Sequence, residues 1–291
     1  MKEKDIKQNH SFASDALRRF RRHKLAMVSL IVLILELVCF LFIPFLLSMD
    51  PYTMDTAAGF TAAPGNGHIL GTDSLGRDVL ARVLFGGRTS LFVGILSTLV
   101  SAAIGIPLGL LAGYYRGMIE AVIMRLSEVF LSVPSFILIL VLVSLIGPSV
   151  TSVMLVIGVM GWPRFSKVIY GSVLSVREKD YVEAARAVGA QNKTILWRYI
   201  FPNAFSPVLV AFTFGVASAI LQESSLSFLG MGVQPPAASW GNILYEAQSI
   251  TILTYKPWLW VPAGVLLMVT ILSINFFGDG LRDALDPKMK L

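Results

Sequence analysis

The sequence predicts an all-α integral membrane protein with six transmembrane helices, and three observations support this fold class. The 291 residues are 55% hydrophobic and only 14% charged, whereas soluble domains carry about 25% charged residues. Six apolar stretches reach the roughly 20 residues that a helix needs to cross a bilayer. Lysine and arginine gather at the edges of these stretches, as they do beside membrane helices.

The six predicted spans follow one another with polar links between them. They are Leu25–Met49, Leu91–Tyr114, Val122–Ile146, Val150–Tyr170, Ala204–Leu229 and Trp258–Phe277. The first is longer than the apolar region of a signal peptide and no cleavage site follows it, so we expect it to remain in the protein.

Basic residues predict the orientation of the spans. Of the 24 Lys and Arg residues, 20 fall on the side that holds both termini, and only Arg77, Arg82, Arg88 and Lys256 fall on the other. Because basic residues favour the cytoplasmic side, we expect both termini to be cytoplasmic. Residues 1–24 are then a basic segment whose SDALRRFRRHK forms an interfacial helix or a plain charged anchor, and residues 279–291 form a tail.

Two segments are expected outside the cytoplasm. Residues 50–90 follow the first span (25–49) and contain DSLGRDVLARVLFGGR, which predicts an amphipathic helix, Leu75–Leu84, lying on the membrane surface. Asp73 or Ser74 would cap that helix. The second segment, GMGVQPPAASWGNILYEAQS, is rich in turn-forming residues.

A polar block interrupts the apolar pattern in the predicted cytoplasmic loop 175–203. Its first half, YVEAARAV, predicts a short helix with Asp180 as N-cap and Glu183 as the capping-box partner. Four residues at helical spacing would form an apolar face: Tyr181, Ala184, Ala185 and Val188.

The second half of the block predicts a stop, a further helix and a break. Gly189 would end the first helix because it readily adopts positive φ. Lys193–Phe201 would form the second helix, which Pro202 would break before the fifth span. Such a block fits a helix that docks into a groove of a partner protein. It fits equally well a segment that lies on the membrane with no partner.

The sequence lacks the residues that common membrane enzymes need. His10, His23 and His68 all lie outside the spans, Cys39 is the one cysteine, and neither H-E-x-x-H nor a P-loop motif occurs. We therefore expect no catalytic residue, no metal site and no ATP site in this chain.

Few ionisable or strongly polar residues fall inside the spans. Glu36 has no obvious partner, and Arg125 with Glu128 fits a structural pair on one helix face. The most polar patch consists of Gln222, Glu223 and Ser224. This patch would either line a translocation path or bond to neighbouring helices.

The polar block resembles the EAA loop of the permease subunits of binding-protein-dependent ABC importers. The matching positions are Glu183, Ala184, Ala185, Gly189 and Pro202, although Tyr-Ile-Phe-Pro stands where Ile-x-Leu-Pro is usual. Two further stretches, GTDSLGRDVLARVLFGGRTSL and SLSFLGMGVQPPAASWG, resemble the dipeptide/oligopeptide/nickel permease family, in particular its second permease subunit.

This resemblance implies a type I ABC importer permease fold in a bacterial inner membrane, with residues 91–278 as the core permease domain. The expected partners are a homologous permease subunit, two cytoplasmic ATPase subunits that hold ATP and Mg²⁺, and an extracellular solute-binding protein, but no nucleic acid. The binding protein would dock at Arg77, Arg82, Pro235 and Trp240.

The resemblance implies peptide cargo, with a nickel or other metal chelate as the alternative. Two other classes of function compete with an importer subunit. A stand-alone secondary transporter would need more charged residues at the membrane midplane and repeat symmetry. An intramembrane enzyme would need the missing catalytic set.

Overall fold

A computed structural model describes residues 12–65 and 67–285, and within these ranges every regular element is a helix. Five helical segments are long and apolar enough to cross a membrane. They are α2 (Lys24–Leu46), α3 (Val79–Tyr115), α6 with α7 (Val150–Met160 and Trp162–Arg177), α11 (Ser206–Phe228) and α14 (Val261–Leu285). Five of the six predicted spans therefore correspond to helical segments that are long and apolar enough to cross a membrane.

The third predicted span, Val122–Ile146, is broken into two helices. α4 (Gly117–Ser132) and α5 (Ser135–Ile146) meet at 86°, so the pair counts as a sixth span only if it is taken together. Val133 is extended, with φ −94° and ψ 136°. The bend arises because Pro134 disfavours a helical conformation at the residue before it.

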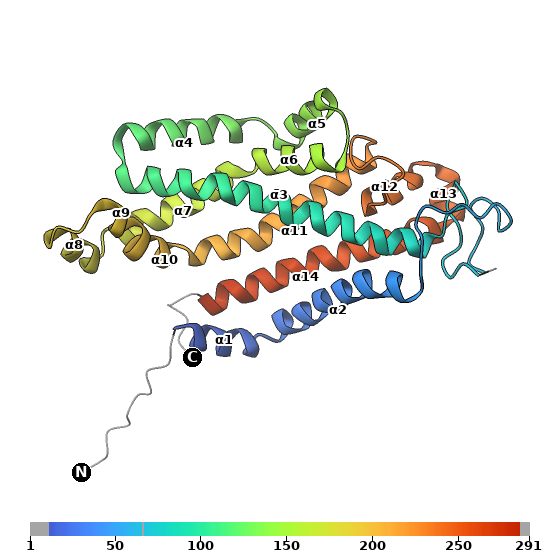
Figure 1. The fold of residues 1–291 in the computed structure, drawn as a ribbon, viewed down its shortest axis with the longest axis horizontal. Helices are drawn as coiled ribbons and strands as arrows, with labels where there is room; N and C mark the ends of the chain where they lie inside the picture. The colour runs from blue at the N-terminus through green and yellow to red at the C-terminus, as the bar shows by residue number, and fades with distance from the viewer. Residues whose placement is uncertain (1–11, 66, 286–291) are drawn as a thin grey trace, which may run out of the picture.

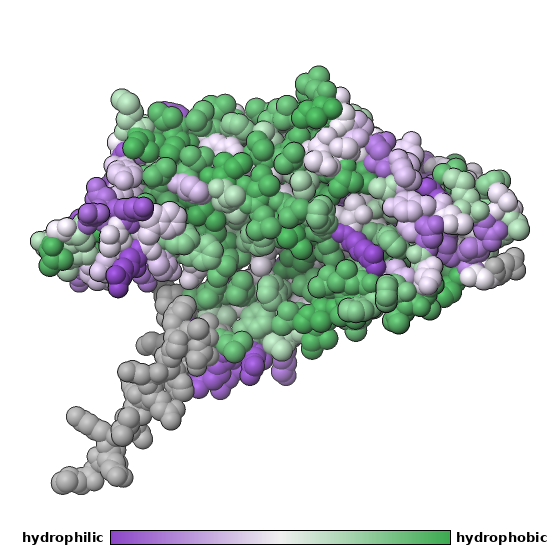
Figure 2. All heavy atoms as spheres, in the orientation of Figure 1, coloured by the Kyte–Doolittle hydropathy of each residue, from purple (hydrophilic) through white to green (hydrophobic). Residues whose placement is uncertain are grey.

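The spanning helices run side by side along the long axis of the molecule (Figure 1). α8 (Asp180–Ala187) lies at one end. The other end holds the loop before α3, together with α12 (Trp240–Leu244) and α13 (Ile250–Tyr255). Two 3₁₀ turns, Tyr245–Gln248 and Pro257–Leu259, follow α12 and α13 there. Figure 2 shows a broad apolar belt between two polar ends. A bilayer perpendicular to the long axis matches this pattern.

Both ends of the described chain meet at the α8 end of the bundle. α1 (Phe12–Arg22) packs on α14, with the rings of Phe20 and Phe277 5.5 Å apart. His23 Nε2 also lies 3.5 Å from Asp283 Oδ2. The predicted placement of both termini on one side is therefore consistent with the packing, although residues 1–11 and 286–291 lie outside the described ranges.

The fourth span continues further than predicted. Its helices run from Val150 to Arg177 over 28 residues, not to Tyr170. Arg164 and Lys167, which the charge count places at the cytoplasmic end of the predicted span, therefore lie well inside the helical span. A buried stripe at helical spacing, Phe165, Ile169 and Val173, continues the helix past these charges.

The start of the second span also differs from the prediction. The interfacial helix Leu75–Leu84 does not form as a separate element, because α3 begins at Val79 and continues without interruption to Tyr115. Neither Asp73 nor Ser74 caps it. Asp78 is the N-cap, and its Oδ1 accepts a hydrogen bond of 2.7 Å from Ala81 N–H. Gly76, at φ +77°, makes the turn that keeps the preceding residues out of the helix.

α3 and α7 pack closely against each other over a long stretch of the bundle. Gly105, Gly109 and Gly113 recur every fourth residue on the face of α3 that meets α7. A Cβ atom at Gly113 would lie 2.7 Å from Val173 Cγ1, which is too close for an unshifted neighbour. Small residues at this spacing let two membrane helices approach closely. α3 and α7 are thus expected to move as one unit.

The two isolated ionisable features of the spans both have partners. Thr270 Oγ1 of α14 donates a hydrogen bond of 2.8 Å to Glu36 Oε2 of α2. Arg125 Nη1 lies 2.9 Å from Glu128 Oε2 on the exposed side of α4, which confirms the predicted structural pair.

Candidate functional site: the polar block at one end of the bundle

The polar block begins with α8, whose N-cap lies one residue before the predicted N-cap, Asp180. Lys179 occupies the N-cap position and makes no side-chain cap bond, so the predicted capping box of Asp180 and Glu183 is wrong. Both acidic residues instead lie in the first turn. They still favour the helix there because the N-terminal end of a helix dipole is positive.

α8 has one buried face and one exposed apolar face. Val182 and Ala185 are 0% and 6% exposed and pack into the main cluster of buried residues with Leu110 and Ile169. Tyr181, Ala184 and Val188 instead face outward, and Val188 is 84% exposed. Of the four residues predicted to share one face, only Ala185 points inward. The exposed face therefore holds apolar side chains that nothing in the described chain covers.

Gly189 ends α8 as predicted, with φ +79°. Its N–H bonds to Arg186 O at 3.0 Å, and Ala190 N–H bonds to Ala185 O at 3.0 Å. These two bonds are the Schellman pattern, which satisfies carbonyl groups left over at a helix end. A residue with a β-carbon would be strained at this φ.

The second half of the block is helical but is not stopped by Pro202. α9 (Asn192–Thr194) leads into a π-helical turn, Ile195–Ile200, and then α10 (Phe201–Ala204). Pro202 lies in the first turn of α10, where its missing N–H costs nothing, so the predicted break at this residue is wrong. The regular helix is interrupted at Phe205 instead, ahead of α11.

Tyr114, at the end of α3, joins the polar block to the bundle. Its hydroxyl donates a hydrogen bond of 2.7 Å to Asn192 Oδ1. The guanidinium of Arg186 lies 5.8 Å from the centroid of the same ring. Arg177 of α7 donates to Tyr114 O at 3.0 Å and to Gly113 O at 3.3 Å. Sequence reasoning missed this anchor, because its residues come from three separate parts of the chain.

Comparison with known proteins identifies this architecture. Residues 105–291 match the family of binding-protein-dependent transport system inner membrane components, and residues 11–64 match the N-terminal TM domain of oligopeptide transport permease C. The chain belongs to the binding-protein-dependent transport permeases.

Two curated relatives resemble this permease over almost its whole length. The oligopeptide transport system permease protein OppC of Bacillus subtilis (strain 168) is 35% identical over 289 residues, which cover 99% of this chain and 93% of the relative. The glutathione transport system permease protein GsiD of Pectobacterium atrosepticum is 38% identical over 274 residues, which cover 94% and 90%.

The fold is shared with a solved transporter structure. A chain of the MetNI methionine ABC transporter, in an inward-facing conformation, aligns with a TM-score of 0.58 at 21% identity. The alignment covers 71% of the permease and 96% of that chain. The expected type I permease fold is thereby confirmed.

The residues predicted to line a path fall into different environments in the permease. Glu223 is 0% exposed, and its carboxylate accepts hydrogen bonds from Ser90 at 2.8 Å and Ser227 at 2.7 Å. Its surroundings favour the alternative interpretation, a carboxyl group that bonds to neighbouring helices. Ser224 is also buried. Gln222 instead lines a cavity of about 160 Å³ between α3, α7 and α11.

Most residues predicted to meet a binding protein are buried in the outer end of the permease. Arg77 and Arg82 are each 5% exposed and lie 2.7 and 3.2 Å from Asp73 Oδ2. Trp240 is 0% exposed and donates a hydrogen bond of 3.1 Å to Val83 O. Pro235 alone of the four is exposed. The buried three organise the outer loops, and a docking partner would meet exposed neighbours of theirs.

The described residues contain no candidate metal centre. Within 12–65 and 67–285, no three His, Cys, Asp or Glu side chains converge as metal ligands would.

Proposed function

We propose that this chain is one of the two permease subunits of an ATP-driven importer of di- and oligopeptides in a bacterial inner membrane. The names of its relatives, oligopeptide and glutathione permeases, support peptide cargo over a nickel chelate. A homologous permease would complete the path, a solute-binding protein would deliver the cargo, and two ATPase subunits would hold ATP and Mg²⁺. The chain itself would be neither an enzyme nor a holder of cofactors, with both termini in the cytoplasm.

The observation that carries this proposal is the exposed apolar face of α8 at one end of the bundle. Tyr181 is 43% exposed and Val188 84% exposed. An isolated helix of eight residues would not be stable in water. α8 is held by its buried face and by the Schellman stop at Gly189. A stabilised short helix with an uncovered apolar face is suited to the groove of a partner protein.

The contacts that connect the polar block to the bundle support a role of α8 as a coupling helix. Motion of a docked ATPase subunit would reach α3 through Tyr114, which bonds to Asn192 of the block. It would continue to α7 through Arg177, which bonds to the carbonyl of Tyr114. Since α3 and α7 pack at van der Waals distance along their glycine face, they would swing together. ATP binding would then bias the permease between two conformations through the partner's differential contacts.

A charge placed on the exposed face of α8 tests the proposal. The variant Ala184→Arg should reduce co-purification of the ATPase subunits and ATP-dependent peptide uptake at least about tenfold, because it buries a charge in the docking groove. Ala184 is exposed, so the permease itself should fold normally. The matched control is Ala57→Arg, the same change at an exposed alanine in the loop at the opposite end. It should leave co-purification of the ATPases unchanged.

Two results would contradict the proposal in different ways. Wild-type levels of ATPase association and of uptake in Ala184→Arg would show that α8 is not the docking element. Uptake by the isolated chain, driven by an ion gradient and independent of ATP, would instead support a secondary transporter.

A further inference from the structure

Arg164 lies in the middle of the fourth span, where a charge is costly. The span from Val150 to Arg177 has 28 residues, so any stretch of about 20 residues within it contains Arg164. No acidic side chain lies within 4.0 Å of its guanidinium among the described residues. Charges inside membrane segments usually pair with another group or face a water-filled pathway. The described chain offers Arg164 no acidic partner of its own.

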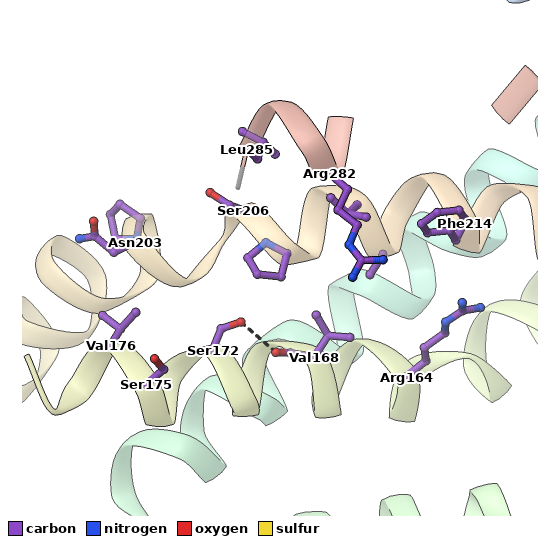
Figure 3. A pocket seen from close by; sticks show the side chains of 14 residues that line it. Arg164, Val168, Ser172, Ser175, Val176, Asn203, Ser206, Phe214, Arg282 and Leu285 are labelled. Carbon is purple, nitrogen blue, oxygen red and sulfur yellow. Dashed lines mark hydrogen bonds between the residues drawn. The ribbon is translucent and has the colours of Figure 1, made fainter. Parts of the chain in front are cut away.

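Arg164 lines two cavities that lie on either side of it. The larger, about 930 Å³, opens between α7, α10, α11 and α14 toward the α8 end, and Arg282 also lines it. Figure 3 shows the side chains of Arg164 and Arg282 extending toward the space between α7 and α11. The smaller, about 160 Å³, lies deeper, between α3, α7 and α11. Because Arg164 lines both, the two cavities adjoin and form one strip that leads toward the α8 end.

Residues at both interruptions of the helical spans line the smaller cavity. Leu131 and Ser135 flank the bend between α4 and α5, and Gly161 separates α6 from α7, and all three line this cavity. Irregular backbone at membrane depth is tolerated where it lines a cavity inside the protein. The breaks therefore mark a built cavity and not a packing defect.

Positively charged, polar and apolar side chains all line the strip. Ser97 and Ser101 donate their hydroxyl protons to Met154 O and Gly158 O, which leaves oxygen lone pairs toward other donors. Gln222 adds an amide, and Val168 and Phe214 supply apolar wall. Neither cavity has an Asp or Glu among its described lining residues. The strip can thus hold an anion, peptide-bond N–H groups and apolar side chains together.

We propose that this strip is a binding site for the peptide during transport, with Arg164 holding its C-terminal carboxylate. The inference rests on the proposed function, because it assigns a contact to the cargo of that importer. A guanidinium binds a carboxylate through two parallel N–H···O bonds, which makes Arg164 a specificity-determining residue. Hydroxyl and amide groups in the deeper cavity would meet the peptide backbone behind it.

The test compares a peptide with the same peptide lacking its carboxylate charge. The full importer, with its binding protein and ATPases, is reconstituted in liposomes and supplied with trialanine or trialanine amide. The ratio of the two uptake rates should fall about tenfold in Arg164→Gln relative to wild type, the usual size for one charged hydrogen-bonded contact. Because both complexes use the same binding protein, its own preference cancels in this comparison. Arg164→Lys should retain part of the discrimination.

A matched control and a second measurement make the result specific. Lys167→Gln removes an exposed cation one turn along α7 that lines neither cavity, and it should leave the ratio unchanged. Equilibrium dialysis of the nucleotide-free complex without binding protein should show the same loss of preference for trialanine.

Three results would overturn the assignment. Equal loss of uptake for both peptides in Arg164→Gln would show a structural role. Dissociation of the two permease subunits in that variant would place Arg164 in their interface. A third result would be peptide uptake by Arg164→Gln that is restored in neutral lipid alone, together with inhibition of wild-type uptake by anionic lipid. This result would assign the arginine to a lipid phosphate. If the wild-type importer takes up neither peptide with ATP, the proposed function itself fails.

Discussion

The two ends of the permease differ in how they hold charge, although both expose apolar side chains, Ile69 at the outer end among them. At the outer end, Asp73 and its two arginine partners are almost completely buried and bond to one another. At the α8 end, Tyr181 and Val188 present apolar side chains to the surroundings.

This difference bears on the proposed docking of a partner at the α8 end. The outer end pairs Asp73 with two arginines of the same chain, so this network is expected to persist without a partner. The α8 end leaves apolar surface uncovered, which in a soluble region marks an interaction site. Damage to the outer end should therefore appear first as lost stability, and damage to the α8 end as lost coupling.

Removal of the outer carboxylate should produce the largest loss of stability. In Asp73→Asn the new side chain keeps the shape of the old one, and its oxygen can still accept from Leu75 N–H and Arg77 N–H. The two buried arginines lose their counter-ion, which costs about 3 kcal/mol or more. The midpoint of thermal unfolding in detergent, followed by tryptophan fluorescence, measures this loss.

The exposed ion pair of α4 provides the control for that measurement. Arg125 Nη1 and Glu128 Oε2 are 2.9 Å apart, similar to the outer pair, but the side chains are 84% and 51% exposed. Glu128→Gln should therefore cost less than about 1 kcal/mol. Equal losses in the two variants would mean that burial does not distinguish the outer network.

The α8 end should be sensitive to backbone conformation at Gly189. In Gly189→Ala nothing lies within 4 Å of the added Cβ, so any effect comes from φ +79° and not from a clash. This strain costs about 1–2 kcal/mol. We expect faster hydrogen exchange in the amides of α8, measured by mass spectrometry, with a global unfolding midpoint close to that of the wild type.

Gly171→Ala is the matched control for Gly189→Ala. A methyl group added at Gly171 would also meet open space, but this glycine lies inside α7 with ordinary helical φ. Alanine there should stabilise the helix by about 0.5–1 kcal/mol. Unchanged exchange of α8 in Gly189→Ala would show that the stop at residue 189 tolerates a β-carbon.

The sequence predicts the parts of this fold that depend on local pattern. Five spans, the position of α8 and the stop at Gly189 follow from apolar length, helical spacing and the freedom of glycine. The errors occur where neighbours decide the outcome. α8 faces inward through Val182 because α3 and α7 lie there, and a periodic pattern does not reveal which side will be covered.

The end of the fourth span is the most informative error. The charge pattern places Arg164 at the cytoplasmic edge of a span that ends at Tyr170, because positive residues usually mark that edge, yet α7 continues to Arg177. The buried stripe Phe165, Ile169 and Val173 is the available signal. The cavities beside Arg164 involve several helices each, so no single stretch of sequence could predict them.

The smallest expected effect concerns pH and distinguishes the outer end from the α8 end. His68 Nδ1 lies 2.7 Å from Asp78 Oδ2, and its Nε2 lies 3.3 Å from Asp55 Oδ2. The bond to Asp78 is the main cause that raises the pKa of His68, while partial burial lowers it. The pKa of Asp55 is lowered, first by the Ala58 N–H and then by His68.

These shifts predict that the outer loop is most stable in mild acid. Charged His68 contributes fully below its ordinary pKa of about 6.5, and this contribution disappears as the pH rises through its raised pKa. The contribution of Asp55 is present above about pH 3.9 and is lost as the pH falls through its lowered pKa. The unfolding midpoint should therefore decrease as the pH rises above about 6.5 in the wild type, and His68→Gln should flatten that decrease. An equal decrease in both proteins would assign the pH dependence to another part of the molecule, and the outer end would then lose this distinction from the α8 end.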